Sequence, residues 1–234
     1  NGDGTFRNVT LPSGLAATGL TTSVASADLN GDGFADLYDV GYCRGEKPLR
    51  EQCVESEIGE ARSCNPLAFD AEPDRIWAGN GDGTFSDRSE WLGEHEPGRG
   101  FALVVGDFDH QVGLETYVAN DMTANQYWAG AADASEFALS DHAPIRAGCI
   151  EPSKPLLAYG TQWIDADNDG SLEAIIANGD IDDFSFEGRV YQQSVQLMRQ
   201  VRRGNWSVVD AAGLGKYFDR KVLARSVASL DADR

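Results

Sequence analysis

Residues 22–39 read TSVASADLNGDGFADLYD, and this stretch decides the fold. A short strand of small and apolar residues leads into an acidic loop that begins at Asp28, and a second apolar strand follows at Leu37. The Asn-Gly and Asp-Gly pairs supply the positive φ that tight turns require. The stretch therefore predicts two antiparallel strands joined by an acidic turn.

The same unit recurs along the 234-residue chain, which is long enough to bury a core. Residues 101–120 read FALVVGDFDHQVGLETYVAN and residues 161–178 read TQWIDADNDGSLEAIIAN. A fourth copy begins at residue 224 with ARSVASLDAD. The four loops begin at Asp28, Asp107, Asp165 and Asp231. Repeats of this kind predict one structural unit that is stacked several times.

A second pattern lies between the loops. Residues 74–87 read DRIWAGNGDGTFSD, which is typical of a hairpin, and NGDGTF at residues 1–6 repeats its turn. In the third unit, residues 195–201 and 206–210 take this place. Each unit therefore offers four short strands, which are typical of one blade of a β-propeller. A β-sandwich is the alternative, but it leaves the recurrence of the same acidic loop after the same strand unexplained.

We therefore predict an all-β fold, a β-propeller of four-stranded antiparallel blades. Residues 1–234 form a single propeller segment with three blades and partial blades at both ends. A Cys-rich insertion at residues 43–73 interrupts the first blade. Since propellers have about four to eight blades, we expect sequence outside this chain to supply the rest of the ring.

The loops are spaced like calcium sites, because Ca²⁺ prefers oxygen ligands that alternate along a short loop. Loop positions 1, 3, 5 and 9 supply side chains, and position 7 supplies a backbone carbonyl. The first loop offers Asp28, Asn30, Asp32, Phe34 and Asp36. The second offers Asp107, Asp109 and Glu115, and the third offers Asp165, Asp167, Asp169, Ser171 and Glu173. A solvated acidic turn is the alternative for each loop.

The second loop departs from the pattern, because Gln111 and Val112 replace the acid and the glycine at positions 5 and 6. We expect it to hold calcium more weakly than the other two loops, or not at all. An EF-hand is excluded, since it needs a Glu at position 12, where these loops have Asp39 and Ile176.

The amino-acid composition indicates which partners and which cellular compartment to expect. The net charge of -19 disfavours nucleic acid and anionic membranes, and no apolar run is long enough for membrane insertion. The even number of cysteines indicates disulfides and an oxidising compartment. We expect one disulfide within the set Cys43, Cys53 and Cys64, and a second between Cys149 and the remaining member.

At this point the chain resembles a known family. DLNGDGFADLY at residues 28–38, DADNDGSLEAIIANG at residues 165–179 and the NGDGTF turns are similar to VCBS/FG-GAP repeats, the blades also found in integrin α-subunit heads. YVANDMTAN at residues 117–125 resembles the ASPIC/UnbV group, which includes cartilage acidic protein. The resemblance implies a seven-bladed, calcium-binding propeller that is extracellular (secreted, cell-surface or periplasmic) and serves adhesion.

The expected partner is a protein or glycan ligand on a propeller face. A propeller-scaffold enzyme, such as a polysaccharide lyase or hydrolase, is one alternative, and a structural subunit of a surface assembly is another. Fold alone does not separate these possibilities. The sequence shows no nucleophile elbow, phosphate-binding loop or His-based triad, and its three histidines are scattered. We therefore expect a binding module and no enzyme.

Overall fold

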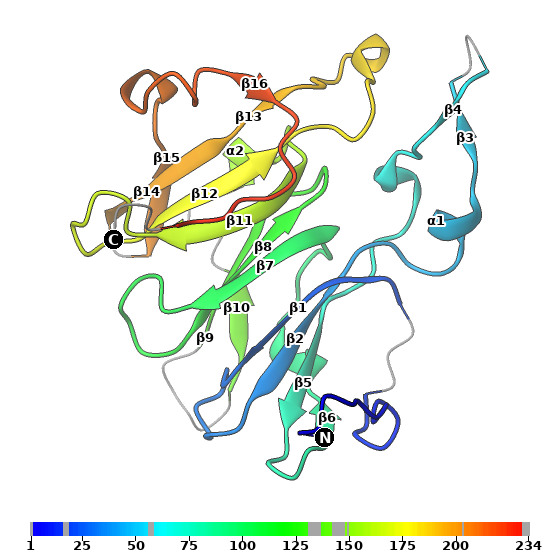
Figure 1. The fold of residues 1–234 in the computed structure, drawn as a ribbon, viewed down its shortest axis with the longest axis vertical. Helices are drawn as coiled ribbons and strands as arrows, with labels where there is room; N and C mark the ends of the chain where they lie inside the picture. The colour runs from blue at the N-terminus through cyan, green and yellow to red at the C-terminus, as the bar shows by residue number, and fades with distance from the viewer. Residues whose placement is uncertain are drawn as a thin grey trace.

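Three four-stranded antiparallel sheets make up most of the molecule in the computed structural model (Figure 1). The structure describes residues 2–15, 19–55, 59–130, 137–141, 148, 150–202 and 204–230. The first sheet contains β1 (Thr21–Ala27), β2 (Asp36–Gly41), β5 (Arg75–Gly79) and β6 (Phe85–Asp87). The second contains β7 (Gly100–Gly106), β8 (Glu115–Asn120), β9 (Gln126–Gly130) and β10 (Leu139–Asp141). The third contains β11 (Ala158–Ile164), β12 (Glu173–Asn178), β14 (Gln196–Arg202) and β15 (Asn205–Val208).

The remaining elements are short. Two-residue strands pair as β3 (Cys53–Val54) with β4 (Ala61–Arg62), and as β13 (Gln193–Ser194) with β16 (Lys221–Val222). The α-helices are α1 (Lys47–Arg50) and α2 (Ile150–Ser153). Single 3₁₀ turns are η1 (Pro66–Ala68), η2 (Ser89–Trp91), η4 (Ser185–Glu187) and η5 (Ala211–Gly213). The prediction of an all-β protein built from four-stranded antiparallel units is confirmed.

The first strands of the three sheets lie side by side. Strand β7 packs beside both β1 and β11 (Figure 1). The hydroxyl of Thr22 in β1 donates to the carbonyl of Gly100 in β7 at 2.6 Å. Beyond β11, the segment that follows residue 223 continues the series, because the Gly160 amide donates to the Arg225 carbonyl at 3.0 Å. This segment is the start of the fourth copy in the sequence.

Two apolar cores fill the spaces between neighbouring sheets. One lies between the first and second sheets and includes Tyr38, Ile76 and Trp128. The other lies between the second and third sheets, where Phe108 stacks on Trp163 at a centroid distance of 4.1 Å. Full burial of an apolar side chain such as Ile or Phe stabilises the folded state by about 1.5–3 kcal/mol. Burial on both sides explains why all six residues of β8 are buried and why this strand shows no polar alternation.

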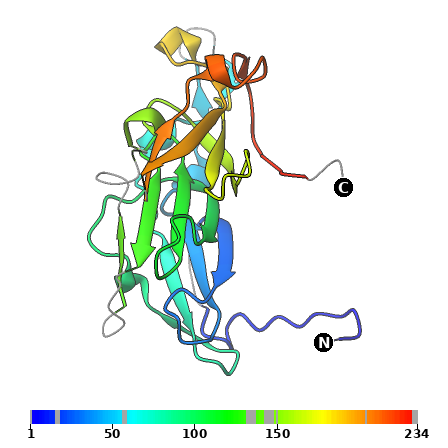
Figure 2. The same ribbon diagram turned by 90° about the vertical axis from the view of Figure 1, so that its left-hand side faces the viewer.

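The repeated turn motif has the same local structure in both copies. In the β5–β6 hairpin, the Thr84 amide donates to the Asp82 carboxylate at 2.9 Å. Near the N-terminus, the Thr5 amide donates to Asp3 at the same distance. Phe85 is paired within β6, whereas the equivalent Phe6 is 96 % exposed. Figure 2 shows that the N-terminal and C-terminal segments both project from the same side of the sheets.

The Cys-rich insertion is held by one disulfide, Cys53–Cys64, as the sequence predicts. The prediction that Cys149 bonds to the remaining cysteine is wrong, because Cys43 is a buried free thiol. Its side chain lies against the Pro66 carbonyl in the protein interior, where burial raises the pKa of the thiol. Cys149 itself lies outside the described residues, as do Asp231 and Asp233 of the fourth loop.

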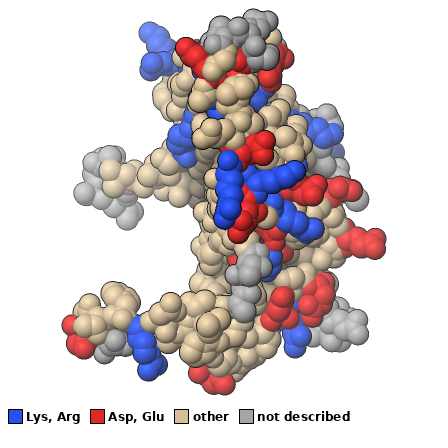
Figure 3. All heavy atoms as spheres, turned by 90° about the vertical axis from the view of Figure 1, so that its right-hand side faces the viewer, with Lys and Arg blue, Asp and Glu red and all other residues tan. Residues whose placement is uncertain are grey.

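Hydrogen bonds from two places in the chain hold the insertion against the sheets. The Arg99 guanidinium donates to the carbonyls of Pro66 and Phe69 at 2.9 and 2.6 Å. The amide and hydroxyl of Ser63 both donate to Asp182 at 2.7 Å, which ties the insertion to the loop after β12. Figure 3 shows the face that lies on the right in Figure 1, where basic and acidic side chains gather together near the centre.

Candidate metal sites in the acidic loops

The three acidic loops lie at the same end of their sheets, on the left in Figure 1. Each joins the first strand of a sheet to the second: β1 to β2, β7 to β8 and β11 to β12. Neighbouring loops also touch, because the His110 ring nitrogen Nε2 lies 3.0 Å from the Gly170 carbonyl oxygen. The helices of an EF-hand are absent from both sides of each loop, in agreement with the sequence prediction.

All three loops share one backbone design. Position 4 has a left-handed conformation in each, with φ of 74° at Gly31 and 58° at both His110 and Asn168. The acid at position 9 is buried and accepts a hydrogen bond from the amide of position 2. The distances are 2.9 Å for Asp36 and Leu29, 2.6 Å for Glu115 and Phe108, and 2.9 Å for Glu173 and Ala166. This bond closes the loop and aims the acid at its centre.

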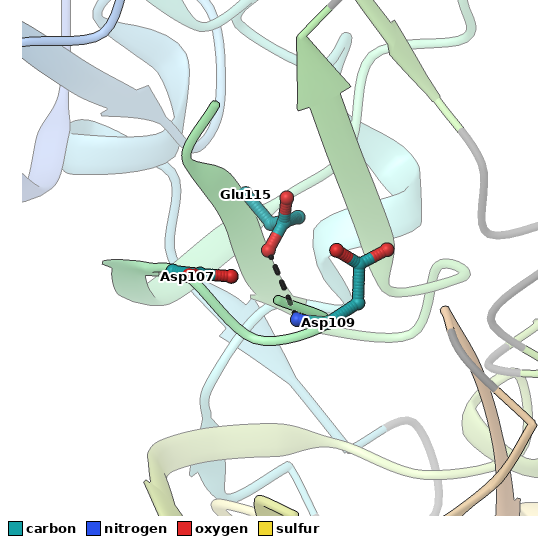
Figure 4. Close-up of side chains that lie close together, drawn as sticks. All are labelled: Asp107, Asp109 and Glu115. Atoms are coloured by element: carbon teal, nitrogen blue, oxygen red, sulfur yellow. Dashed lines mark hydrogen bonds between the residues drawn. The ribbon is translucent and has the colours of Figure 1, made fainter. Parts of the chain in front are cut away.

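The second loop brings three carboxylates together. One oxygen from each of Asp107, Asp109 and Glu115 lies within 4.8 Å of the other two, and the three groups face a common space (Figure 4). Burial, together with the negative charges of Asp109 and Asp107, raises the pKa of Glu115 to about 7. A cation among the three oxygens would reverse this effect, because it favours the charged form of each carboxyl group.

The turn glycine missing from position 6 of the second loop is replaced one residue later. Gly33 and Gly170 have positive φ at position 6 of their loops, with values of 89° and 87°. In the second loop Gly113, at position 7, has a φ of 109°. The sequence pattern counts this loop as degenerate, yet its backbone still makes the turn. The Gly directly after Val112 was the signal that could have revealed it.

The third loop also brings three carboxylates together, from Asp165, Asp167 and Glu173. It holds a basic side chain as well. The Arg199 guanidinium of β14 lies 2.7 Å from the Asp167 carboxylate and 3.5 Å from that of Glu173. Asp169 lies outside this set of three and instead accepts a hydrogen bond from the Ser171 amide at 2.8 Å. A metal ion here would have to compete with Arg199 for two of its ligands.

The first loop uses its acids differently. Asp28 accepts hydrogen bonds from the amides of Gly31, Asp32 and Gly33. Both oxygens of Asp36 are also taken, one by the Leu29 amide and the other by the Gly79 amide, each at 2.9 Å. Within the described residues, the first loop therefore does not form a set of three acids as close as those of the other two loops. The backbone carbonyls of Phe34 and Ser171 stay predicted ligands.

Together, the fold and these loops define a class: an all-β protein of repeated four-stranded sheets with acidic strand–loop–strand turns. The comparison with protein families agrees, because a model described as an FG-GAP-like repeat matches residues 1–38. The match covers the N-terminal turn motif, β1 and the first acidic loop. Such a repeat suggests a β-propeller-like adhesion or binding module. No curated protein matches the chain.

Proposed function

We propose that the chain is a segment of a calcium-binding β-propeller that acts as an extracellular binding or adhesion module. The observation that carries the metal assignment is the convergence of three carboxylates in the second loop, repeated in the third. Calcium suits these sites because the three converging side chains of each offer hard oxygen ligands. Asp107, Asp109 and Glu115 would hold one ion, and Asp165, Asp167 and Glu173 would hold another.

The packing of the sheets supports the propeller. The first strands β1, β7 and β11 are neighbours in chain order, and residues 224–230 extend the series beyond β11. In a propeller, the first strand of each blade lines the central axis, so successive first strands lie side by side. Further blades of the same kind would complete a ring, for which we propose seven blades on the resemblance to FG-GAP propellers.

The disulfide Cys53–Cys64 supports an oxidising, extracellular compartment. Among the described residues, no helix is long and apolar enough to cross a membrane. We favour a binding function over an enzymatic one, with a protein or glycan ligand on one face. The acids in the loops are arranged around possible metal positions, which suits a structural role for the ion in holding neighbouring blades.

Thermal melting with calcium and with a chelator tests the proposal. Because calcium binds only the native state, a concentration 100-fold above the Kd stabilises the fold by about 2.7 kcal/mol. For a domain of this size, that corresponds to a rise in Tm of about 5–10 °C. We expect EDTA to reverse the rise and magnesium at the same concentration to reproduce only part of it.

Asp109→Asn is the informative variant, because an amide oxygen can still accept the hydrogen bond from the Gln111 amide. We expect it to lose much of the calcium-dependent shift. Asp82→Asn is the matched control, since Asp82 holds the β5–β6 turn through the same kind of hydrogen bond outside the loops. If saturating calcium leaves the melting of the wild-type protein unchanged, the loops are acidic turns and the metal assignment is wrong.

A further inference from the structure

A cavity of about 850 Å³ lies against the second sheet, apart from the acidic loops. Its walls come from the segment that links the first sheet to β7 and from the turn that joins β8 to β9. The floor and rim include Trp128, His95, Met122, Glu94 and Glu96. Its volume falls in the range of about 300–1,000 Å³ that is typical of small-molecule sites.

The YVANDMTAN motif at residues 117–125 builds one wall of this cavity. The Asn120 amide donates to the Asn125 side chain at 2.8 Å, and the Asn120 side chain donates to the Ala124 carbonyl at 2.7 Å. The Asn125 side chain donates in turn to the Tyr117 hydroxyl at 2.7 Å. This network holds Met122 at a φ of 53°, a conformation that costs a non-glycine residue free energy. Contacts within the protein therefore set the shape of this wall.

The opposite wall is fitted closely to the motif. Gly98 packs against the Asn120 side chain, and a Cβ at residue 98 would overlap it. Next to it, Arg99 is committed to the carbonyls of Pro66 and Phe69. The His95 ring packs edge-on against Trp128 at 4.8 Å, and its Nδ1 lies 2.7 Å from the Gly93 carbonyl oxygen. The cavity is thus formed by residues that other contacts already hold in place.

The lining combines an apolar floor with an acidic rim. Trp128 is 1 % exposed, and its Nε1–H has no hydrogen-bond partner among the described residues. Met122 and Pro97 add partly exposed apolar surface. Glu94 and Glu96 are exposed at the rim, and neither makes an ion pair within the described part of the chain. Asp141 adds a third acid to the lining, and Arg99 and Lys154 add two bases, so acids are in the majority.

We propose that this cavity binds a small organic cation with an apolar body, such as an alkylammonium group. The apolar part would cover Met122 and Pro97, and the charged end would lie between Glu94 and Glu96. This site is separate from the calcium loops, and the inference does not depend on calcium binding.

Three probes of matched size test the charge preference: n-butylammonium, n-butanol and butyrate. We expect butylammonium to bind tightest and butyrate weakest, with a clear loss of butylammonium affinity at high salt. Nuclear magnetic resonance of the tryptophan indole and histidine ring signals reports occupancy, and Trp128→Phe and His95→Asn assign the signals of the site. Equal binding of the three probes, or no binding, would overturn the proposal.

The variant Glu94→Gln/Glu96→Gln tests the rim without changing its shape. We expect its affinity for butylammonium to fall about two- to fivefold for each charge removed, while n-butanol binds as before. Glu46→Gln/Glu51→Gln is the matched control, because it also removes two exposed charges and both residues lie outside the cavity. An equal loss in both variants would mean that only the net charge of the protein matters. Adding EDTA separates this site from the calcium loops, since we expect probe binding to remain.

Discussion

The second and third acidic loops have the same architecture and different electrostatics. In both, a buried glutamate at position 9 closes the loop and three carboxylates converge within 4.8 Å. In the third loop, Arg199 lies between Asp167 and Glu173. In the second loop, burial and two neighbouring acids raise the pKa of Glu115 to about 7. The loop that matches the sequence pattern better is thus the one whose acids are already partly neutralised.

The comparison shows that a loop's agreement with a motif and its readiness to bind a cation are separate properties. The motif identifies the residues whose side chains offer oxygen ligands. The free energy of binding also depends on the groups that already interact with these oxygens. An incoming cation must displace a basic side chain such as Arg199 or bind beside it. The sequence predicts a weaker second loop, and that order of affinities stays a prediction. Because Arg199 already pairs with two acids of the third loop, we propose the opposite order, with the second loop as the stronger site.

The largest effect should come from Glu115→Gln. The change removes the buried charge. The amide oxygen of the new glutamine can still accept the hydrogen bond from the Phe108 amide, so the loop should stay closed. We expect the calcium affinity of the second loop to fall at least about 30-fold, as when one partner of a buried charge pair is lost. Isothermal titration calorimetry measures it, with Glu173→Gln as the matched variant for the third loop. If Glu115→Gln leaves the titration unchanged, the second loop is not the stronger site.

A smaller effect is expected from Gly113→Ala. Gly113 has a φ of 109° and nothing near its Cβ position, so an alanine there would suffer backbone strain without a steric clash. We expect a cost of about 1 kcal/mol, or about fivefold in the calcium affinity of the second loop. Gly170→Ala should do the same to the third loop only. Calcium titrations of both variants check this, and a neutral Gly113→Ala would show that position 7 of the second loop does not need a glycine.

The smallest expected effect is also the most direct test of the difference between the second and third loops. Arg199→Met keeps an unbranched apolar stem at this position and removes the charge from the third loop. We expect the calcium affinity of that loop to rise about two- to fivefold, because the ion pair is half-exposed and weak. Without calcium, the same variant should melt at a lower temperature, since the acids lose their cation. Arg202→Met, an exposed change on the same strand, is the control. A third loop that binds no better without Arg199 would mean that charge competition does not separate the two loops.

The sequence by itself determined the repeating unit. Strand, acidic loop and hairpin can be read locally, because tight turns need Gly, Asn or Asp and each strand lies within a few residues of its partner. The NGDGTF turns and the four-strand units are found where the pattern places them. The sequence also named the acids that converge in the second and third loops, since alternate positions of a short loop point to a common centre. That these acids bind a metal stays a prediction.

Tertiary structure alone decided how those acids are used. Arg199 reaches Asp167 from β14, and the Gly79 amide of β5 takes the second oxygen of Asp36. Both contacts depend on the register between strands that are far apart in the chain. Cys43 is a buried free thiol for the same reason, since its neighbours come from the folded insertion. Charge and hydrogen-bond energies change steeply with distance, so a local pattern can name the ligands of a site but not their competitors.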